Sequence, residues 1–498
     1  MINYKRNIPF SVSMFCSLQV PIKEKSEKRF LKIEHWRISK KVKYLISIVI
    51  IAVLLISIFA FFPRNSVIEA NMIQQSTEDQ TNQTNQTNSP PASTTEPQAP
   101  KKESQTDYVG EVLKSIYWNP EGYKDPGLIR STYTINSTTW MQVGANAWAY
   151  FTPDVGVDPN TGLPYASASR FRYFTDWDLG SYVQAVITAQ EIGLIDVNGT
   201  WGSYERFDKV LTFLEDRPLN EYGYPFQFYD ATTGREYLPD SNASAKIADI
   251  GDTGKLFVAL NNLRNFNSTF APRVNSIVLS GRSNYTALVP NVLNHLYKKD
   301  VYHYYVYSGF ASFWPQQLEA VPSVILGNIL NAQNLTTYGV SLPNATICNE
   351  PLLYSLFELN NGDNLELLGL LTQVYFACEA FYNSTGEFMA PSEGTNGGEW
   401  LYEWIVAPNG EPWRITDVLG NYREDLYSIV RNKVAISFLA IYGTDFARNM
   451  VVWLEDALPN PANGYFEGTD NYGIYMPSPG DIGNALILEA ALYALQKG

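Results

Sequence analysis

The chain has 498 residues, 45% of them hydrophobic and 14% aromatic, which is enough apolar material for one large core or two smaller ones. Its formal net charge of −14 is unevenly distributed, because residues 1–43 carry 11 Lys and Arg against 3 Glu and leave a net charge of −22 on the remainder. Phosphate binding requires a basic face, so this acidity argues against nucleic acid as a partner of the main domain.

The sequence also lacks the patterns of the common metal and cofactor sites. Beyond residue 43 there are two histidines, His295 and His303, and no Cys/His spacing of a zinc site. There is no Asp-x-Asp-x-Asp-Gly calcium loop, no Gly-x-Ser-x-Gly elbow and no phosphate-binding loop after a strand. We therefore expect no metal and no cofactor. Cys348 and Cys378 could pair, although their spacing does not show that they are close.

The N-terminal region predicts a membrane anchor. Residues 44–62 contain no charge, and 19 helical residues nearly span a hydrocarbon layer of roughly 30 Å. Three lysines just before this span place residues 1–43 in the cytoplasm by the positive-inside rule. The alternative is a cleaved signal peptide, but a charged lead of 43 residues is too long for one. We predict a single-pass protein of the cell membrane whose main domain lies outside.

Residues 63–106 are rich in Pro, Thr, Asn and Gln and predict a disordered tether that holds the main domain, 107–498, away from the membrane. An external location is supported by ten Asn-x-Ser/Thr sequons, two of them in the tether (Asn82 and Asn85). The others are Asn136, Asn198, Asn242, Asn267, Asn284, Asn334, Asn344 and Asn383. So many sequons on an external chain predict glycosylation.

The main domain is dominated by segments with helical periodicity. They are 107–117, 178–194, 203–215, 253–264, 286–298, 316–333, 352–360, 364–382, 424–440, 445–457 and 483–496. Several are apolar nearly all round, whereas others are amphipathic. Segments with period 2 are few, and the clearest, 301–310, is interpreted as a loop hairpin. This pattern predicts an all-α domain, a toroid of paired helices with buried inner helices, long loops and a few short hairpins.

Two similar phrases stand at helix starts behind aromatic, acidic loops: "DIGDTGKLFVAL" (249–260) and "DIGNALILEAAL" (481–492). Asp252 and Asn484 precede apolar runs, where a side-chain oxygen can cap the helix. That structural role is one interpretation, and it is the stronger one for Asn484. The other is that loops at one end of the toroid bring their carboxylates to a central cleft.

The chain resembles a family of bacterial and archaeal proteins known as domain of unknown function 3131. The resemblance rests on five stretches in the family's order: 175–196, 223–234 with "DIGDTGKLFVAL", 349–359, 384–394, and 463–468 with "DIGNALILEAAL". More distantly, Tyr229-Asp230 followed by an Asp-led helix resembles the glycoamylase-like group that includes endo-β-1,2-glucanases. That likeness implies an (α/α)6 toroid acting on glucans.

Several acidic residues lie among aromatic ones. Glycoside hydrolysis requires two carboxyl groups, one that stays protonated and one that stays ionised. The candidates near aromatics or glycines are Asp176, Asp178, Asp252, Glu350, Glu393, Glu399, Glu403 and Glu467. Aromatic candidates for sugar contact are Trp177, Tyr224, Phe226, Tyr229 and Trp404. Each acid has a structural alternative: Asp176, Asp178 and Glu350 as groups at helix starts, and Glu399 and Glu403 as solvated charges.

Our hypothesis makes Glu350 or Glu393 the general acid and Asp252, or a second acidic loop residue, the base that activates water. Asp176, Trp177, Asp178 and Glu467 would contact the substrate, with the aromatic residues named above. Toroids of this kind often invert configuration, which predicts carboxyl groups roughly 6.5–9.5 Å apart. The predicted partner is a polysaccharide or surface glycan. The alternative function is a non-catalytic glycan-binding or envelope-scaffold protein. Acids paired with arginines would favour this alternative, whereas two juxtaposed acids would favour the enzyme.

Overall fold

The computed structural model describes residues 135–168, 171–238, 248–359, 364–458, 463–474 and 478–497. These residues belong to one compact unit, which is mostly helical. The predicted helix 107–117, span 44–62 and tether 63–106 lie outside the described residues. Within the described ranges no helix is both long enough and apolar enough to cross a bilayer.

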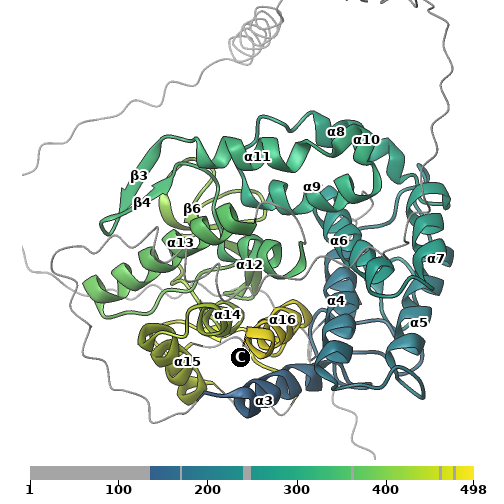
Figure 1. Cartoon of the computed structure of the whole chain (residues 1–498), viewed down its shortest axis with the longest axis horizontal. Helices are drawn as coiled ribbons and strands as arrows, with labels where there is room; N and C mark the ends of the chain where they lie inside the picture. The colour runs from purple at the N-terminus through teal and green to yellow at the C-terminus, as the bar shows by residue number, and fades with distance from the viewer. Residues whose placement is uncertain are drawn as a thin grey trace, which may run out of the picture. The chain divides into compact units, whose positions relative to one another are not determined.

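Six helices form a closed inner ring, in which each packs against the next and the last against the first (Figure 1). In order around the ring they are α4 (Asp176–Ile192), α6 (Ile250–Phe266), α9 (Val301–Phe313), α12 (Asn349–Glu358), α14 (Asn432–Tyr442) and α16 (Asp481–Lys497). All six bury side chains on most of their faces, which explains why several are apolar nearly all round. The ring closes where α16 packs against α4.

The remaining helices form an outer layer, each packed on an inner helix or a neighbouring outer one. They are α3 (Ser137–Trp148), α5 (Ser203–Asp216), α7 (Ala271–Asn275), α8 (Val289–Leu293), α10 (Pro315–Leu318), α11 (Val321–Leu330), α13 (Asn364–Thr385) and α15 (Asp445–Ala457), with short turns η1 (Ala149–Phe151), η3 (Ser276–Ser280) and η4 (Tyr285–Leu288). Inner and outer helices alternate along the chain, so the predicted toroid of helix pairs is confirmed (Figure 1).

Short antiparallel strands occupy the connections. The two-stranded pairs are β1 (Tyr173–Phe174) with β2 (Tyr229–Asp230), β3 (Asn334–Thr337) with β4 (Val340–Pro343), and β8 (Val430–Arg431) with β9 (Gly468–Thr469). A three-stranded sheet, β5 (Gly394–Asn396), β6 (Glu399–Val406) and β7 (Pro412–Asp417), lies between α13 and α14 in the chain. In its register Leu401 faces Gly394 on one side and Asp417 on the other.

The hairpin predicted at 301–310 is wrong, because these residues form α9. Asp300 caps this helix by accepting hydrogen bonds from the backbone N–H groups of Tyr302 and His303, at 2.8 and 3.4 Å. The alternation of tyrosine and valine suggested a strand with one buried face. However, α9 is an inner helix covered on several sides, so buried residues occur at positions that periodicity assigns to solvent.

The close crossing of α6 and α9 depends on glycine. A Cβ atom on Gly309 would lie 2.2 Å from the carbonyl oxygen of Gly254. We expect Gly309→Ala to lower the free energy of unfolding by about 1–3 kcal/mol, because the clash involves backbone that cannot rotate away. The matched control is Gly327→Ala in α11, where an added Cβ meets nothing within 4 Å. This control should be neutral or stabilise by about 0.5–1 kcal/mol, as alanine replaces glycine in a helix. Chemical denaturation of both variants checks the prediction, and equal effects would contradict it.

Several other helix boundaries differ from the prediction. The predicted helix 424–440 begins only at Asn432, and 316–333 divides into α10 and α11. The predicted helix 286–298 is replaced by η4 and the short α8, and α3 was not predicted.

Six of the predicted glycosylation sites are exposed, Asn267 is partly buried, and Asn242 lies outside the described residues. The Asn267 amide nitrogen already donates to the Tyr204 hydroxyl at 2.7 Å. Cys348 and Cys378 are both buried as free thiols.

Candidate active site

The first turns of the six inner helices meet at one end of the ring. Asp178 of α4 lies beside Asp481 of α16, and Glu350 of α12 is paired with Lys433 of α14. Asp252 of α6 lies within electrostatic range of Asp178. Tyr302 of α9 contributes its hydroxyl group to the same cluster. Helix N-termini favour negative charge, so this end of the ring suits a group of carboxylates.

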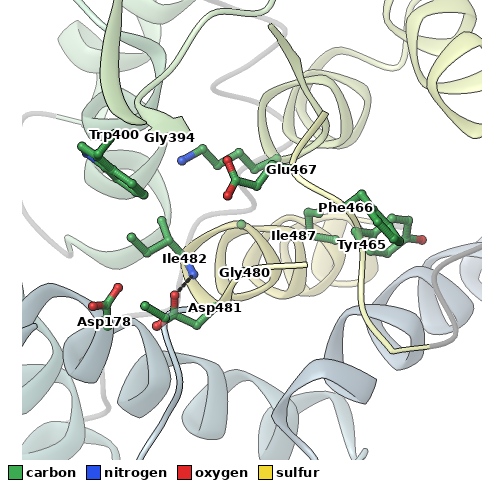
Figure 2. Close-up of a pocket in the computed structure, with 13 residues that line it drawn as sticks. Asp178, Gly394, Trp400, Tyr465, Phe466, Glu467, Gly480, Asp481, Ile482 and Ile487 are labelled. Atoms are coloured by element: carbon green, nitrogen blue, oxygen red, sulfur yellow. Dashed lines mark hydrogen bonds between the residues drawn. The ribbon is translucent and has the colours of Figure 1, made fainter. Parts of the chain in front are cut away.

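A small pocket lies in this region. Its lining comes from the starts of α4, α14 and α16 and from the loops around β5, β6 and β9, and it includes Asp178, Gly394, Trp400, Lys433, Glu467 and Asp481. Figure 2 shows Asp178 and Asp481 side by side, with Glu467 on another side of the pocket. The volume of about 40 Å³ is enough for a few water molecules. Trp400, which lines this pocket, is partly exposed.

The paired carboxyl groups of Asp178 and Asp481 differ in their environments. Asp178 accepts a hydrogen bond from the Thr175 backbone N–H at 2.7 Å, within the capping box that starts α4. Burial raises the pKa of Asp178 to about 6, although these hydrogen bonds oppose the rise. Burial and the neighbouring Asp178 raise the pKa of Asp481 well above its ordinary value. Both carboxyl groups therefore take up a proton more readily than a solvent-exposed aspartate does.

A second pair of carboxyl groups is formed by Glu393 and Glu350, both buried. Glu350 accepts hydrogen bonds from Lys433 Nζ and, at 2.8 Å, from Ser392 Oγ. Burial, followed by the negative charge of Glu350, raises the pKa of Glu393 well above its ordinary value, while Lys433 and a hydrogen bond from Tyr302 act in the opposite direction. The net effect favours the protonated form of Glu393.

Gly394, directly after Glu393, holds this loop in place. Its φ of +150° is uncommon for other residues, and an added Cβ would lie 2.6 Å from Arg431 Nη1 and 2.8 Å from Glu467 Oε2.

Asp252 is half-buried in the first turn of α6, but Asp249 is the residue that caps this helix, accepting from the Gly251 and Asp252 backbone N–H groups at 2.6 and 3.2 Å. Burial and the charge of Asp249 raise the pKa of Asp252 well above its ordinary value. The raised pKa of Asp252 favours its neutral form, which does not suit a residue that must act as a base. Asp252 also does not line the small pocket.

Four other predicted acids are neutralised by arginines. Asp176 pairs with buried Arg217 at 2.5 Å. Arg431 bridges Glu403 and Glu467, with a distance of 2.8 Å to each. Glu399 is exposed and pairs with Arg423. The ring end thus contains both juxtaposed carboxyl pairs and acids held by arginines.

The predicted aromatic residues are mostly structural. Trp177 is buried against Tyr302, Tyr305 and Tyr354. Tyr229 is fully buried, and its hydroxyl donates to the Pro218 carbonyl at 2.8 Å. Tyr224 and Phe226 are partly buried against the core. Trp404 is buried and lines a different pocket. Trp400, which neighbours two predicted acids, is the aromatic side chain from β6 in the small pocket.

Two central residues, Asp481 and Lys433, were not predicted. Asp481 belongs to the repeated "DIG" phrase, and that repetition was the signal for it, but the cap prediction fell on Asn484. In fact the Asn484 amide accepts from the Tyr465 backbone N–H at 2.7 Å and donates to the Gly480 carbonyl at 2.7 Å, so it fixes the preceding loop instead of capping α16. Lys433 had one weak signal, a single charge within the apolar run of α14.

Among the described residues, no group of three or more His, Cys, Asp and Glu side chains has a geometry that could hold a metal ion.

Comparisons with known proteins were made on this fold. The structure is similar to a protein named as a candidate glucoamylase from Bacteroides uniformis ATCC 8492 (TM-score 0.53, 14% identity, covering 73% of this chain and 95% of that one). It is also similar to a β-1,2-glucanase from Parabacteroides distasonis (TM-score 0.50, 14% identity, 72% and 57%). A third is an endo-β-1,2-glucanase from Chitinophaga pinensis in complex with sophorotriose and glucose (TM-score 0.50, 12% identity, 73% and 95%).

At such low identity these similarities establish the toroid fold and no more. No curated protein matches the sequence. Residues 142–497, however, match the family described as protein of unknown function DUF3131, which confirms the resemblance seen in the sequence. The chain therefore belongs to the DUF3131 family.

Proposed function

We propose that this protein is a glycoside hydrolase that cleaves or remodels an external polysaccharide or surface glycan. The observation that carries the proposal is the meeting of two buried carboxyl pairs, Asp178 with Asp481 and Glu350 with Glu393, at one end of the helical ring. Burial raises the pKa of Asp178 to about 6 and that of Glu393 well above its ordinary value, and carboxyl groups of different proton affinity allow one site to provide an acid and a base together.

In this mechanism Glu393 is the general acid. Its raised pKa keeps it protonated, so it can give a proton to the glycosidic oxygen as the bond from that oxygen to the anomeric carbon breaks. Asp178, with a pKa of about 6, is ionised above that pH and accepts a proton from a water molecule that attacks the anomeric carbon. The small pocket beside Asp178 has room for that water.

Asp481 and Lys433 act as positioning residues. Asp481 lies beside Asp178 in the small pocket and is held there by a hydrogen bond that its carboxyl group accepts from the Ile482 backbone N–H at 2.7 Å. Lys433 holds Glu350, whose charge helps Glu393 to retain its proton. The assignment moves the role of base from Asp252 to Asp178, since Asp178 lines the small pocket and Asp252 does not.

The substrate is most usefully sought among glucans, because two of the similar structures are named as β-1,2-glucanases. We further propose that residues 44–62 anchor the protein in the membrane, and that residues 63–106 present a glycosylated domain to an external polymer. The uncharged span and the exposed sequons support this arrangement.

The direct test is incubation of the purified chain with linear β-1,2-, β-1,3- and β-1,4-glucans, followed by measurement of reducing ends and, by NMR, of the anomer first released. We expect new reducing ends with at least one polymer. Absence of cleavage across a broader panel that includes surface glycans would exclude the hydrolase.

The alternative is a non-catalytic glycan-binding or scaffold protein. The observation in its favour is the pairing of Asp176 and Glu467 with arginines, which leaves these acids unavailable for proton transfer. Binding of a glucan without release of reducing ends would support this alternative.

A further inference from the structure

A second, larger pocket lies on the three-stranded sheet, and we call it the sheet groove. It is lined by β6, β7, the 422–428 segment and the ends of two loops, and its rings are those of Phe381, Trp404, Trp413, Tyr422, Tyr427 and Tyr472. Its volume of about 400 Å³ is ten times that of the acidic pocket and falls within the range of sites that enclose a small ligand.

Two of the aromatic rings of this groove are largely open to solvent. Tyr427 and Tyr472 are 61% and 59% exposed, and their ring centroids are 4.4 Å apart. The Tyr472 hydroxyl donates to Glu387 at 3.0 Å, so this ring is fixed in orientation. Exposed rings held in place provide flat apolar surfaces of the kind on which the C–H faces of sugars stack.

Trp413 is held at the groove at a conformational cost. Its φ of +54° is unfavourable for a bulky residue, as is the φ of +48° at its neighbour Tyr338. The Trp413 indole donates to Thr337 Oγ1 at 2.6 Å and packs 5.6 Å from the ring of Phe381. Strain of this type is found preferentially where a side chain is positioned for a ligand.

The two arginines that line the groove are paired with carboxylates. Arg423 pairs with Asp425 at 2.9 Å and with Glu399 at 2.7 Å. Arg414 pairs with Glu411 at 2.8 Å and lies over the ring of Tyr422. Because these guanidinium groups already have carboxylate partners, the groove is better suited to a neutral ligand rich in hydroxyl groups than to an anion.

The groove is connected to the acidic pocket through β6. Glu403 lines the groove and is bound to Arg431, which is bound in turn to Glu467 of the acidic pocket. Trp404 lines the groove and stacks on Tyr402 with centroids 5.3 Å apart. Burial, followed by the charge of Glu393, raises the pKa of Tyr402 well above its ordinary value, so Tyr402 lies near the proposed general acid.

We propose that the sheet groove binds a second stretch of the same neutral polysaccharide whose reacting bond lies at the acidic pocket. This inference rests on the proposed function and adds to it, because it predicts a preference for long neutral chains over short oligosaccharides.

The test is the double variant Tyr427→Ala/Tyr472→Ala, compared with Tyr222→Ala/Tyr297→Ala, two tyrosines that are 69% and 70% exposed and line neither pocket. Binding is measured by native gel electrophoresis in gels that contain linear β-1,2-glucan, laminarin or hydroxyethylcellulose, with Glu393→Gln in every protein to prevent turnover. We expect about tenfold weaker binding for the groove variant only, as for loss of an aromatic anchor. In proteins that keep Glu393, KM for long glucans should rise while kcat for short oligosaccharides stays unchanged.

Equal retardation of the groove and control variants would overturn the proposal, as would the absence of retardation by any of the three polymers. The result can be separated from that of the proposed function. Polymer binding that depends on the groove, without release of reducing ends, would support the groove and reject the hydrolase. Cleavage of glucans that is unaffected in the groove variant would support the hydrolase and reject the groove as a binding site.

Discussion

Replacement of Glu393 by glutamine is expected to lower kcat on the best glucan substrate by about 10²–10⁴-fold, the usual contribution of a general acid. The amide is nearly the same size and cannot donate a proton to the glycosidic oxygen. It also removes a group that must be kept neutral close to Glu350, so the variant should fold at least as stably as the natural protein. Initial rates and thermal unfolding together check this expectation.

Glu399→Gln is the matched control, because Glu399 lies on the same sheet but is exposed and paired with Arg423. It should keep nearly all activity. Equal losses in both variants would mean that the sheet tolerates no change of charge, and the assignment of Glu393 as the acid would fail. A substrate with a very good leaving group should restore much of the Glu393→Gln rate, since its departure does not need protonation.

Asp176 and Asp178, two buried carboxylates in the first turn of α4, should respond to the same substitution in opposite ways. Asp178→Asn is expected to stabilise the fold by about 3 kcal/mol at neutral pH, because a pKa raised by roughly two units represents that much unfavourable ionisation. Asp176→Asn should destabilise it by about 3–5 kcal/mol, since the buried Arg217 loses its carboxylate partner. Asp178→Asn should also lose activity by about 10²–10⁴-fold, as expected for removal of a base.

The dependence on pH identifies the cause. Below about pH 4 the Asp178 carboxyl is protonated in both the folded and the unfolded chain, so Asp178→Asn should have no stabilising effect there. Between about pH 4 and pH 6 the unfolded chain ionises first, and the stability of the natural protein falls relative to that of the variant. Above about pH 6 the difference is constant. Thermal or denaturant unfolding across this range measures it, and a pH-independent difference would show that packing is responsible.

The activity of the natural protein should follow the same groups. The rate is expected to rise through about pH 6 as Asp178 ionises, and to fall at higher pH as Glu393 loses its proton.

The fold was largely predictable because the outer helices are amphipathic and the inner ones are apolar nearly all round. This contrast can be recognised in the pattern of apolar and polar residues along the sequence. The exception, α9, shows the limit of this reasoning. Its tyrosines are buried on several sides, and two glycines permit the close crossing with α6. Neither fact is visible from periodicity, because both depend on which other helix lies against the segment.

The candidate site was predictable in its residue types and less so in its roles. The placement of acids among aromatics singled out Asp178, Glu350 and Glu393, which the structure brings within electrostatic range of one another. Whether each acid is neutral, ionised or paired depends on partners far away in the chain, such as Arg217 for Asp176 and Lys433 for Glu350. The repeated "DIG" phrase illustrates this dependence: Asp249 is an exposed helix cap, whereas Asp481 is buried against another carboxyl group.

Closure of the ring by α16 has a consequence for biosynthesis. Asp481 belongs to this helix, so the carboxyl group that lies beside Asp178 is synthesised after Asp178, Glu350 and Glu393. A nascent chain that already contains Asp178, Glu350 and Glu393 still lacks the helix that seals α14 to α4. The carboxyl cluster is therefore complete only once α16 has been made and has packed against α4.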